Sequence, residues 1–368
     1  MDILSKKIII LSLISLSLFS CAKKEKQVDS DESEDALSEI ESEKRHEIHT
    51  ILQKMYLDDP DYEVASAYAM GQEELSIPVP YNLDYEQYSI YKGEKAFEIE
   101  VSEYQTFNKS WIFKTSDTNF DIYNLKVHTK YYYRVCEDNI YIETGTFETN
   151  DSLLRNIFVE GVTNFRDLGG YYTSYNKWIR QGILYRSARI NDNYTQKANI
   201  TSLGLEWVKR LGLTMEMDLR TVAESGINVS LLPGVRYISC DWGYSEPAGI
   251  FASSNYPIIR KAFASLANKD NYPMFVHCNI GTDRTGTLSM FLLSILGVDY
   301  INIIRDYLFS NFASIGGVRG MSNLKPILDQ INKEEGDTFN IRAENFLLNA
   351  VGVKQEEIDN IREIMLED

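Results

Sequence analysis

Cys278 and Arg284 are the residues of this sequence whose types and spacing are best suited to chemistry. They lie in the segment HCNIGTDRTG (277–286), which joins the apolar run MFV to a second apolar stretch that extends to Leu296. A loop between a buried strand and a helix can aim several backbone N–H groups at one point, and the positive end of the helix strengthens this field. The same field stabilises a thiolate. The segment therefore predicts a phosphoryl-binding loop with a cysteine nucleophile.

The remaining residues of this loop have supporting roles in the prediction. Arg284 offers a planar fork that matches two phosphoryl oxygens at once, which a lysine cannot do. Gly281 allows the backbone to curve. We expect Thr285 to hydrogen-bond the thiolate as it leaves in a second step, and His277 to orient the loop by hydrogen bonding. The expected phosphate-binding residues are Asn279, Ile280, Gly281, Thr282, Asp283 and Arg284.

Such a loop needs a sheet and helices to position it, and the sequence from Leu153 onward has that pattern. Apolar runs typical of strands alternate with apolar stretches of helical length, which predicts an α/β domain with a largely parallel sheet flanked by helices over residues 153–368. The candidate strands are IFVEGV, WIRQGILYR, TMEMDLR, VRYISC and MFVHC. The candidate helices are 203–211, 258–267 and 285–296, and the part after Asp299 is mostly helical.

Residues 76–150 have a different pattern. Short runs rich in aromatic and β-branched residues, such as FEIEV, WIFKT and KYYYRV, alternate with polar residues. This alternation predicts an all-β sandwich of the immunoglobulin or fibronectin type III kind. Aromatic side chains at alternate strand positions usually fill a core, so we expect a structural or positioning role for this region rather than carbohydrate binding.

The catalytic segment resembles a known family. HCNIGTDRTG matches the Cys-x5-Arg signature of the protein tyrosine phosphatase superfamily, and its surroundings resemble the bacterial tyrosine phosphatases, a family that includes secreted phosphotyrosine and phosphoinositide phosphatases. Residues 125–135 resemble the tyrosine-corner region of fibronectin type III domains. The motifs shared with the phosphatase family are NFRDLGG (164–170), LYRSA (184–188), DLRT (218–221) with Glu224, RDYLFSN (305–311) and FLLNAVGVKQEEIDNIREIM (346–365).

The resemblance implies a mechanism without metal or cofactor, in which a cysteinyl-phosphate forms and Asp283 is the general acid. Asp241 is a rival acid, because other branches of the superfamily carry theirs on an earlier loop. Thr282 replaces a lysine that the family associates with phosphoinositide substrates, which favours phosphotyrosine or another monophosphate ester. A supporting shell around the loop is expected from Arg166, Asp167, Arg186, Asp218 and Arg220.

Three alternative functions remain open at this point. The first is a phosphoinositide or inositol phosphate phosphatase. The second is a surface module that only binds phosphorylated ligands. The third is sulfur or arsenate chemistry on a similar cysteine loop. The intact set Cys278, Asp283 and Arg284 argues against the binding module. The Arg-Thr ending of the loop and its position late in the chain argue against the third alternative.

The N-terminus has the pattern of an export signal. Lys6 and Lys7 precede an apolar run from Ile8 to Phe19, which is too short to span a bilayer. The sequence LFSC that ends at Cys21 resembles the lipobox of bacterial lipoproteins, in which the cysteine becomes lipidated. We therefore expect a signal peptide over 1–20, a lipid-anchored acidic tether with a short helical linker over 21–75, and a membrane-anchored lipoprotein in the cell envelope.

Composition narrows the possible partners further. The 368-residue chain has a formal net charge of −17, which argues against nucleic acid as a partner and requires a local positive pocket for a phosphorylated protein or small phosphoester. Cys136 and Cys240 fall in different expected domains and should be unpaired. His46 and His49 have the spacing of a helical metal pair, but without further ligands nearby they indicate a charged helix face.

Overall fold

The computed structural model describes residues 45–89, 96–195, 197–243, 249 and 252–368. The expected signal peptide, Cys21 and the acidic tether up to residue 44 lie outside the described residues. Residues 45–368 form one compact unit. Within the described part, no helix combines the length and apolar character that a membrane span requires.

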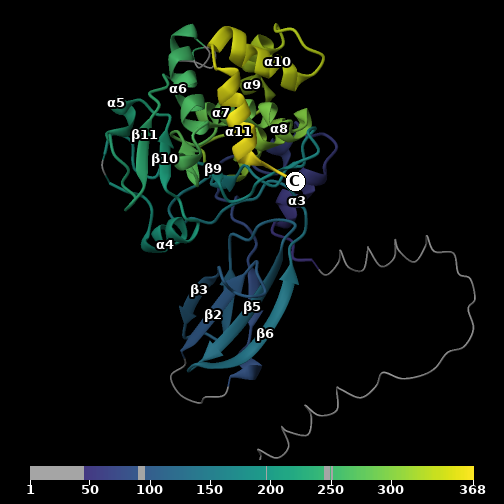
Figure 1. Cartoon of the computed structure of the whole chain (residues 1–368), viewed down its shortest axis with the longest axis vertical. Coiled ribbons are helices and arrows are strands. Elements are labelled where there is room, and N and C mark those ends of the chain that lie inside the picture. Colours follow the sequence, from purple (N-terminus) through teal and green to yellow (C-terminus); the bar gives the residue numbers. More distant parts are fainter. Residues whose placement is uncertain (1–44, 90–95, 196, 244–248, 250–251) are drawn as a thin grey trace, which may run out of the picture. The chain divides into compact units, whose positions relative to one another are not determined.

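A five-stranded sheet forms the centre of residues 153–368, the expected catalytic part, in the order β11-β10-β12-β9-β7 (Figure 1). The first four strands are parallel, and only β7 runs antiparallel to its neighbour β9. This agrees with the predicted largely parallel sheet. The strands are β7 (Arg166–Asp167), β9 (Leu184–Ser187), β10 (Met215–Asp218), β11 (Arg236–Ser239) and β12 (Met274–His277).

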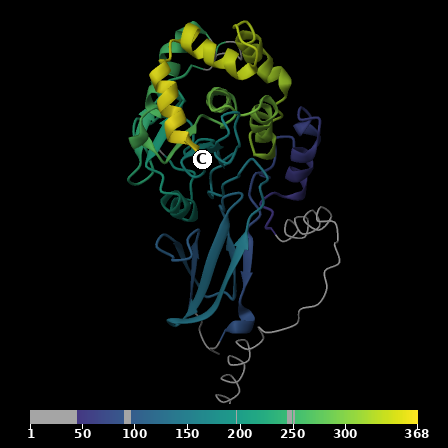
Figure 2. The ribbon, with the colours of Figure 1, turned by 45° about the vertical axis from the view of Figure 1, so that its right-hand side comes forward.

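Helix α7 (Asp283–Ile295) follows β12 and is buried on all sides after its first residue. Its sequence is apolar or small all round, as expected for a helix enclosed by other elements. α10 and α8 pack against it, and Figure 2 shows the yellow C-terminal helices arched over the green ones. The other helices are α3 (Ile51–Asp58), α4 (Ser202–Arg210), α5 (Val222–Ser225), α6 (Tyr256–Leu266), α8 (Tyr300–Leu308), α9 (Met321–Ile331), α10 (Phe339–Asn345), the π-helical η7 (Phe346–Val351) and α11 (Gln355–Met365).

Two of the predicted strands differ from the structure. IFVEGV is not a strand. It turns at Gly161, which has φ +88° and whose added Cβ would lie 2.3 Å from the carbonyl oxygen of Asn199. WIRQGILYR divides at Gly182 (φ +84°) into β8 (Trp178–Ile179) and β9. Its first half pairs with β13 (Leu366–Glu367) instead of joining the central sheet. In both segments a glycine with positive φ interrupts a run that is otherwise suited to a strand.

The region 76–150 holds antiparallel strands. β3, β2, β5 and β6 form a four-stranded sheet, and β1 pairs with β4. The backbone N–H of Lys126 donates to the Tyr131 hydroxyl at 2.8 Å, which is the bond expected of a tyrosine corner. The assignment to a fibronectin type III domain stays a prediction. The strands are β1 (Tyr81–Asp84), β2 (Phe97–Ser102), β3 (Trp111–Thr115), β4 (Asn119–Ile122), β5 (Lys130–Glu137) and β6 (Ile140–Glu148).

Side chains of the catalytic part contact this β region directly. Trp207 of α4 lies 5.7 Å from the ring of Trp111 and 5.9 Å from that of Phe113, measured between centroids. The Gln181 amide both accepts a hydrogen bond from the backbone of Val127 and donates one to it, at 2.9 and 3.0 Å. One buried cluster of apolar side chains includes residues of both regions. The two expected domains therefore share part of their core.

Two smaller expectations concern cysteine and histidine. Cys136 and Cys240 are both free, as predicted. His46 and His49 precede α3 instead of lying on a helix. The ring of His46 faces the carbonyl of Val79 at 3.1 Å, and that of His49 faces the carbonyl of Leu154 at 2.9 Å. They therefore serve the packing of this segment.

Candidate active site

Cys278 lies directly after β12 and is 2% exposed. The loop that follows turns at Gly281, whose φ is +73°. A Cβ at this position would lie 2.5 Å from the carbonyl carbon and oxygen of Ser187, at the end of β9. Glycine is required here for its conformation and for the space, so the loop packs directly against the end of the neighbouring strand.

Arg284, in the first turn of α7, is held by a carboxylate and by backbone carbonyls. Its two terminal nitrogens donate to the carboxylate oxygens of Glu224 at 2.7 and 3.2 Å, and Nη1 also donates to the Trp242 carbonyl at 3.1 Å. Burial lowers the pKa of the guanidinium, but the charges of Cys278 and Glu224 outweigh it, so the pKa of Arg284 stands above its usual value. Arg284 therefore remains a cation beside the cysteine.

Glu224 is fixed in turn by the first turn of the helix α5. It is the N3 residue of α5, where its side chain accepts from the Thr221 N–H at 2.9 Å and the Thr221 hydroxyl accepts from the Glu224 N–H. This capping box orients the carboxylate toward Arg284. Burial raises the pKa of Glu224, but the hydrogen bonds from Arg284 and Thr221 outweigh it and lower the pKa overall.

A fully buried carboxylate, Asp306 of α8, connects two arginines to the loop. Arg166 donates to it through Nε at 2.9 Å, and Arg186 donates to its other oxygen. Arg186 also donates to the carbonyl of Gly281 at 2.6 Å. Burial raises the pKa of Asp306, but the two arginines outweigh it and lower the pKa overall. Burial, with the neighbouring Arg166, lowers the pKa of Arg186 to about 10.

Asn164 completes this support from the other side. It accepts a hydrogen bond from Arg166, and its own Nδ2 donates to the carbonyl of Ile280 at 2.9 Å. Two successive loop carbonyls, those of Ile280 and Gly281, are thus fixed by side chains, which sets the direction of the peptide groups between them. Sequence reasoning selected Arg166 and Arg186 but not Asp306 or Asn164, although both stand inside the quoted motifs RDYLFSN and NFRDLGG.

Arg189 is a further residue that the sequence analysis missed. It follows β9, and its Nη1 donates to the side-chain oxygen of Asn279 at 2.5 Å and to the Asn279 carbonyl at 3.2 Å. Asn279 is the first residue after the cysteine. The signal for Arg189 in the sequence was its place directly after LYRSA, at the same end of the sheet as the loop.

His277 lies beneath the loop in a buried polar cluster. Its Nε2 lies 2.9 Å from Glu216, and its Nδ1 lies 3.2 Å from the carbonyl of Cys278. These contacts suit the orienting role of His277, which stays a prediction. Asp218 and Arg220 form a buried pair at 2.7 Å in the same layer.

The same cluster brings together groups that bind metals elsewhere. Ligand atoms of Glu216, Asp218 and His277 lie within 4.8 Å of one another. However, both oxygens of Asp218 accept hydrogen bonds from Arg220, whose positive charge opposes a cation at this point. The residues therefore fit a hydrogen-bond network better than a metal ion.

Asp167, which we expected beside the loop, has a different place. Its carboxylate accepts hydrogen bonds from Arg155 and from the N–H groups of Gly169 and Gly182, at 2.9 and 2.6 Å for the two glycines. Arg155 itself donates to the carbonyl of Leu125 at 2.8 Å. Neighbouring residues of a strand point to opposite faces, so Arg166 supports the loop while Asp167 stabilises the contact with the β region.

The two candidate acids differ in their surroundings. Asp283, the first residue of α7, accepts hydrogen bonds from Nε and Nη2 of Arg319 at 3.1 and 3.2 Å and from the Tyr307 hydroxyl at 3.1 Å. Asp241 is exposed after β11 and directly precedes Trp242, whose carbonyl bonds Arg284. The structure brings both near the loop.

Two threonines of the loop differ in their bonding. Thr282, where the family pattern has lysine, is fully buried and accepts from Asn164 Nδ2 at 3.3 Å. The Thr282 side chain therefore points into the protein interior. Thr285 is also buried, and its hydroxyl bonds no residue that the structure describes. Its predicted bond to a leaving thiolate stays a prediction.

The family model described as "Tyrosine phosphatase family" matches residues 157–367. The chain belongs to this family. The match begins after the β region and covers the sheet, the cysteine loop and the C-terminal helices, so the expected tyrosine-phosphatase-like hydrolase is confirmed at the level of the family.

Two curated relatives of this phosphatase-family chain carry the name "Putative tyrosine-protein phosphatase". One, from Cupriavidus necator, is 30% identical over 173 residues, which are 41% of this chain and 61% of the relative. The other, from Meyerozyma guilliermondii, is 28% identical over 127 residues, which are 34% of this chain and 65% of the relative. The chain thus spans less than two thirds of the length of each.

Solved structures give a weaker likeness. The core catalytic domain of the PP-IP phosphatase SIW14 from Saccharomyces cerevisiae, in complex with citrate, is 16% identical, with a TM-score of 0.29. The match covers 50% of this chain and 96% of that one.

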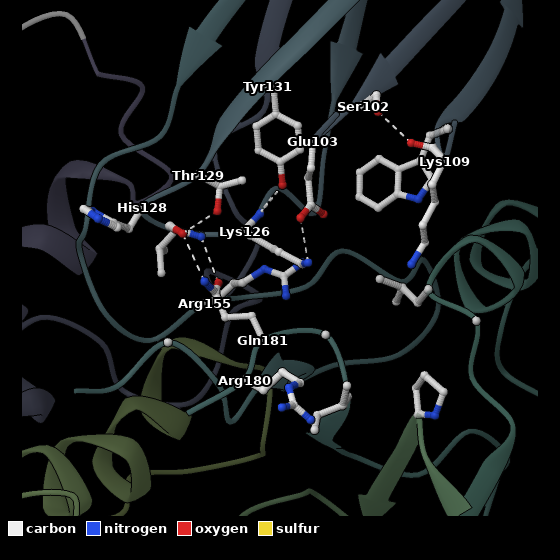
Figure 3. Close-up of a pocket in the computed structure, with 18 of the residues that line it drawn as sticks. Ser102, Glu103, Lys109, Lys126, His128, Thr129, Tyr131, Arg155, Arg180 and Gln181 are labelled. Atoms are coloured by element: carbon white, nitrogen blue, oxygen red, sulfur yellow. Dashed lines mark hydrogen bonds and ion pairs between the residues drawn. The ribbon is translucent and has the colours of Figure 1, made fainter. Parts of the chain in front are cut away.

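A cavity of about 800 Å³ in this phosphatase-family chain lies away from the cysteine loop. Its lining includes Ile183 and Pro273, which directly precede β9 and β12, whereas Cys278 follows β12 at the other end of the sheet. Figure 3 shows its wall on the side of the β region, where Lys126 pairs with Glu103 at 2.9 Å. This cavity is therefore not the site of the cysteine chemistry.

Proposed function

We propose that this chain is a cysteine-dependent phosphomonoester hydrolase that acts on phosphotyrosine through a cysteinyl-phosphate intermediate. The observation that carries the proposal is the placement of Cys278 at the end of a buried strand with Arg284 in the first turn of α7, held by Glu224. A thiolate nucleophile and a fixed cation then share one loop, as phosphoryl transfer requires.

The first half of the proposed reaction transfers the phosphoryl group to sulfur. The Cys278 thiolate attacks phosphorus in line with the ester oxygen, so that an S–P bond forms as the P–O ester bond breaks. A carboxylic acid gives its proton to the leaving oxygen. Arg284 and the loop N–H groups bind the non-bridging oxygens and stabilise the charge that develops on them.

The second half returns the enzyme to its starting state. A water molecule attacks phosphorus, its proton goes to the carboxylate formed in the first half, and the S–P bond breaks. Inorganic phosphate leaves and the thiolate is restored. The hydroxyl of Thr285, which bonds no described residue, is available to stabilise that thiolate.

We assign the acid role to Asp283, with Asp241 as the rival. Arg319 and Tyr307 orient the Asp283 carboxylate, and their three hydrogen bonds suit its base role in the second half. As the acid of the first half, Asp283 has to give up one of these bonds to carry its proton. The pH profiles of Asp283→Asn and Asp241→Asn decide between them, because only the true acid's variant should lose the alkaline limb of kcat.

Phosphotyrosine is the proposed substrate because Thr282 replaces the lysine of the family pattern and is buried, so no cation reaches the substrate from this position. Phosphoinositides and inositol phosphates remain the alternative substrates.

We also propose export to the cell envelope with a lipid on Cys21, which rests on the signal-like N-terminus. Metabolic labelling with a palmitate analogue tests this, since Cys21→Ser should abolish the label.

The proposed activity is tested by steady-state hydrolysis of p-nitrophenyl phosphate and a phosphotyrosine peptide by the full chain in detergent, with EDTA present. We expect turnover that survives EDTA and disappears in Cys278→Ser. Phosphopeptide binding without turnover in the wild type would overturn the enzyme and favour a phospho-ligand binding module.

A further inference from the structure

Arg189 differs from the other arginines around the cysteine loop in having no carboxylate partner in the described part of the chain. Among the described residues, each of the others lies within 4 Å of an acid: Arg166 and Arg186 of Asp306, Arg220 of Asp218, Arg284 of Glu224 and Arg319 of Asp283. Arg189 makes an ion pair with none of the residues that the structure describes. Its Nε is buried and bonds no described group.

Holding Asn279 does not account for this guanidinium. An arginine carries five N–H donors, and both bonds to Asn279 start from a single nitrogen, Nη1. A neutral donor would hold Asn279 equally well without the cost of placing a charge in a half-buried position. The remaining donors and the positive charge therefore lack a use among the residues that the structure describes.

The position of Arg189 indicates which kind of ligand could use its remaining donors and its charge. Asn279 is the residue next to Cys278, so the guanidinium lies at the rim of the loop that would hold the reacting phosphoryl group. In a chain with net charge −17, a cation at this point that pairs with no acid of the described residues is suited to an anion supplied from outside. The Asn279 contacts fix the guanidinium before any ligand arrives, which lowers the entropic cost of binding.

We propose that Arg189 forms a second anion-binding subsite, and that the substrate carries a second anionic group close to the phosphoryl group that is removed. This inference rests on the proposed phosphatase function and specifies its substrate class. Two sources supply the same chemistry: an acidic residue beside phosphotyrosine in a peptide, or a second phosphate on the adjacent carbon of a cyclitol. In both, the second group accepts hydrogen bonds from Arg189 while Arg284 holds the first.

The test compares kcat/KM on two matched pairs of substrates. One pair is a phosphotyrosine peptide with glutamate or glutamine next to the tyrosine, and the other is a cyclitol bisphosphate and its monophosphate. We expect the full-length wild type to prefer the doubly anionic member of one pair by about tenfold, as for a hydrogen-bonded charged contact. Arg189→Met should abolish that preference, and Arg189→Lys should restore part of it.

Two controls separate this role from others. Lys333→Ala removes one positive charge at an exposed position on α9's C-terminal side and should keep the preference of the wild type. Added salt should reduce the preference of the wild type for the doubly anionic substrate, because an ionic contact at a partly exposed site is screened. The ratio of kcat/KM between the two substrates should not change with salt in Arg189→Met.

The outcomes are distinct. Loss of the preference in the peptide pair identifies an acidic peptide, and loss in the cyclitol pair identifies a bisphosphate. If Arg189→Met lowers kcat/KM equally for both substrates of a pair, Arg189 only positions Asn279 and the proposed subsite is wrong. A wild type with no preference in either pair would also overturn the subsite. If the wild type fails to hydrolyse even p-nitrophenyl phosphate, the proposed function itself is wrong.

Discussion

In the proposed mechanism Arg284 binds the phosphoryl group, which requires that its guanidinium is held in place, and Glu224 is the carboxylate that holds it. Glu224→Gln keeps the size of the side chain but replaces a charged partner with a neutral one. Because a hydrogen bond to a charged group contributes about 1.5–3 kcal/mol, we expect kcat/KM for p-nitrophenyl phosphate to fall by about 10–100-fold.

The matched control is Glu363→Gln, an exposed glutamate on α11 far along the chain from the loop. It should retain wild-type activity. Equal activity of Glu224→Gln and the wild type would contradict the role assigned to this pair.

Asp306 is the second residue on which the loop depends. Asp306→Asn leaves Arg166 and Arg186 buried without a charged partner, and removing one member of a buried ion pair typically costs about 3–5 kcal/mol of the free energy of unfolding. Denaturation in urea at neutral pH measures this cost directly.

The pH dependence of that cost has a definite sign. Because the pKa of Asp306 is lowered in the folded protein, the carboxylate binds its proton less readily there than in the unfolded chain. Its contribution is present above the unfolded pKa, near 4, and is lost as the pH falls through the folded pKa. The difference between wild type and Asp306→Asn should therefore shrink in acid, and a difference that grows below pH 4 would be contrary to this assignment.

At the scale of elements, the loop depends on its contact with β9. Gly281→Ala places a Cβ 2.5 Å from the backbone of Ser187, at a residue whose φ is +73°. The backbone of a central strand cannot move away, so the loop must shift. A displacement of about 1 Å in a catalytic group costs about 100-fold in rate, and we expect a loss of this size in kcat on p-nitrophenyl phosphate.

Gly234→Ala is the control for this substitution. Gly234 also has a positive φ, +77°, but nothing lies within 4 Å of an added Cβ. It should cost about 1 kcal/mol in stability and leave kcat unchanged. If both variants lose activity alike, conformational strain rather than the contact with β9 explains the effect.

The sequence predicted the strand and the helix around Cys278, but it did not predict the side-chain contacts that support the loop. The strand–loop–helix order around Cys278 followed from apolar runs and one glycine, and β12 and α7 stand where they were expected. Asp306 was missed because a single acid on an amphipathic helix looks like any solvated charge until the fold buries it between two arginines. Asp167 was misplaced because strand alternation sends it to the face opposite Arg166.

At the scale of the whole molecule, the sequence predicted two separate domains, and the shared core was not visible in it. Trp207 could be recognised as a core residue of a helix, but its partners Trp111 and Phe113 are almost 100 positions earlier in the chain. Periodicity indicates which face of an element is buried and does not indicate which element covers it.

This shared core predicts that the β region and the catalytic part unfold together. Trp207→Ala should lower the free energy of unfolding by about 3–5 kcal/mol, and circular dichroism and tryptophan fluorescence should still report one transition. Trp178→Ala, at a side chain that is 36% exposed, is the control and should have a much smaller effect. Two separate transitions, of which Trp207→Ala shifts only one, would contradict a common core.

The central claim is that Cys278 becomes covalently phosphorylated during turnover, and rapid acid quench followed by mass spectrometry of the digested protein tests it most directly. We predict that the peptide containing Cys278 gains the mass of one phosphoryl group when p-nitrophenyl phosphate is present, and that the same peptide of Cys278→Ser does not. Turnover with no phosphorylated cysteine peptide, or with the phosphoryl group on another residue, would contradict the account.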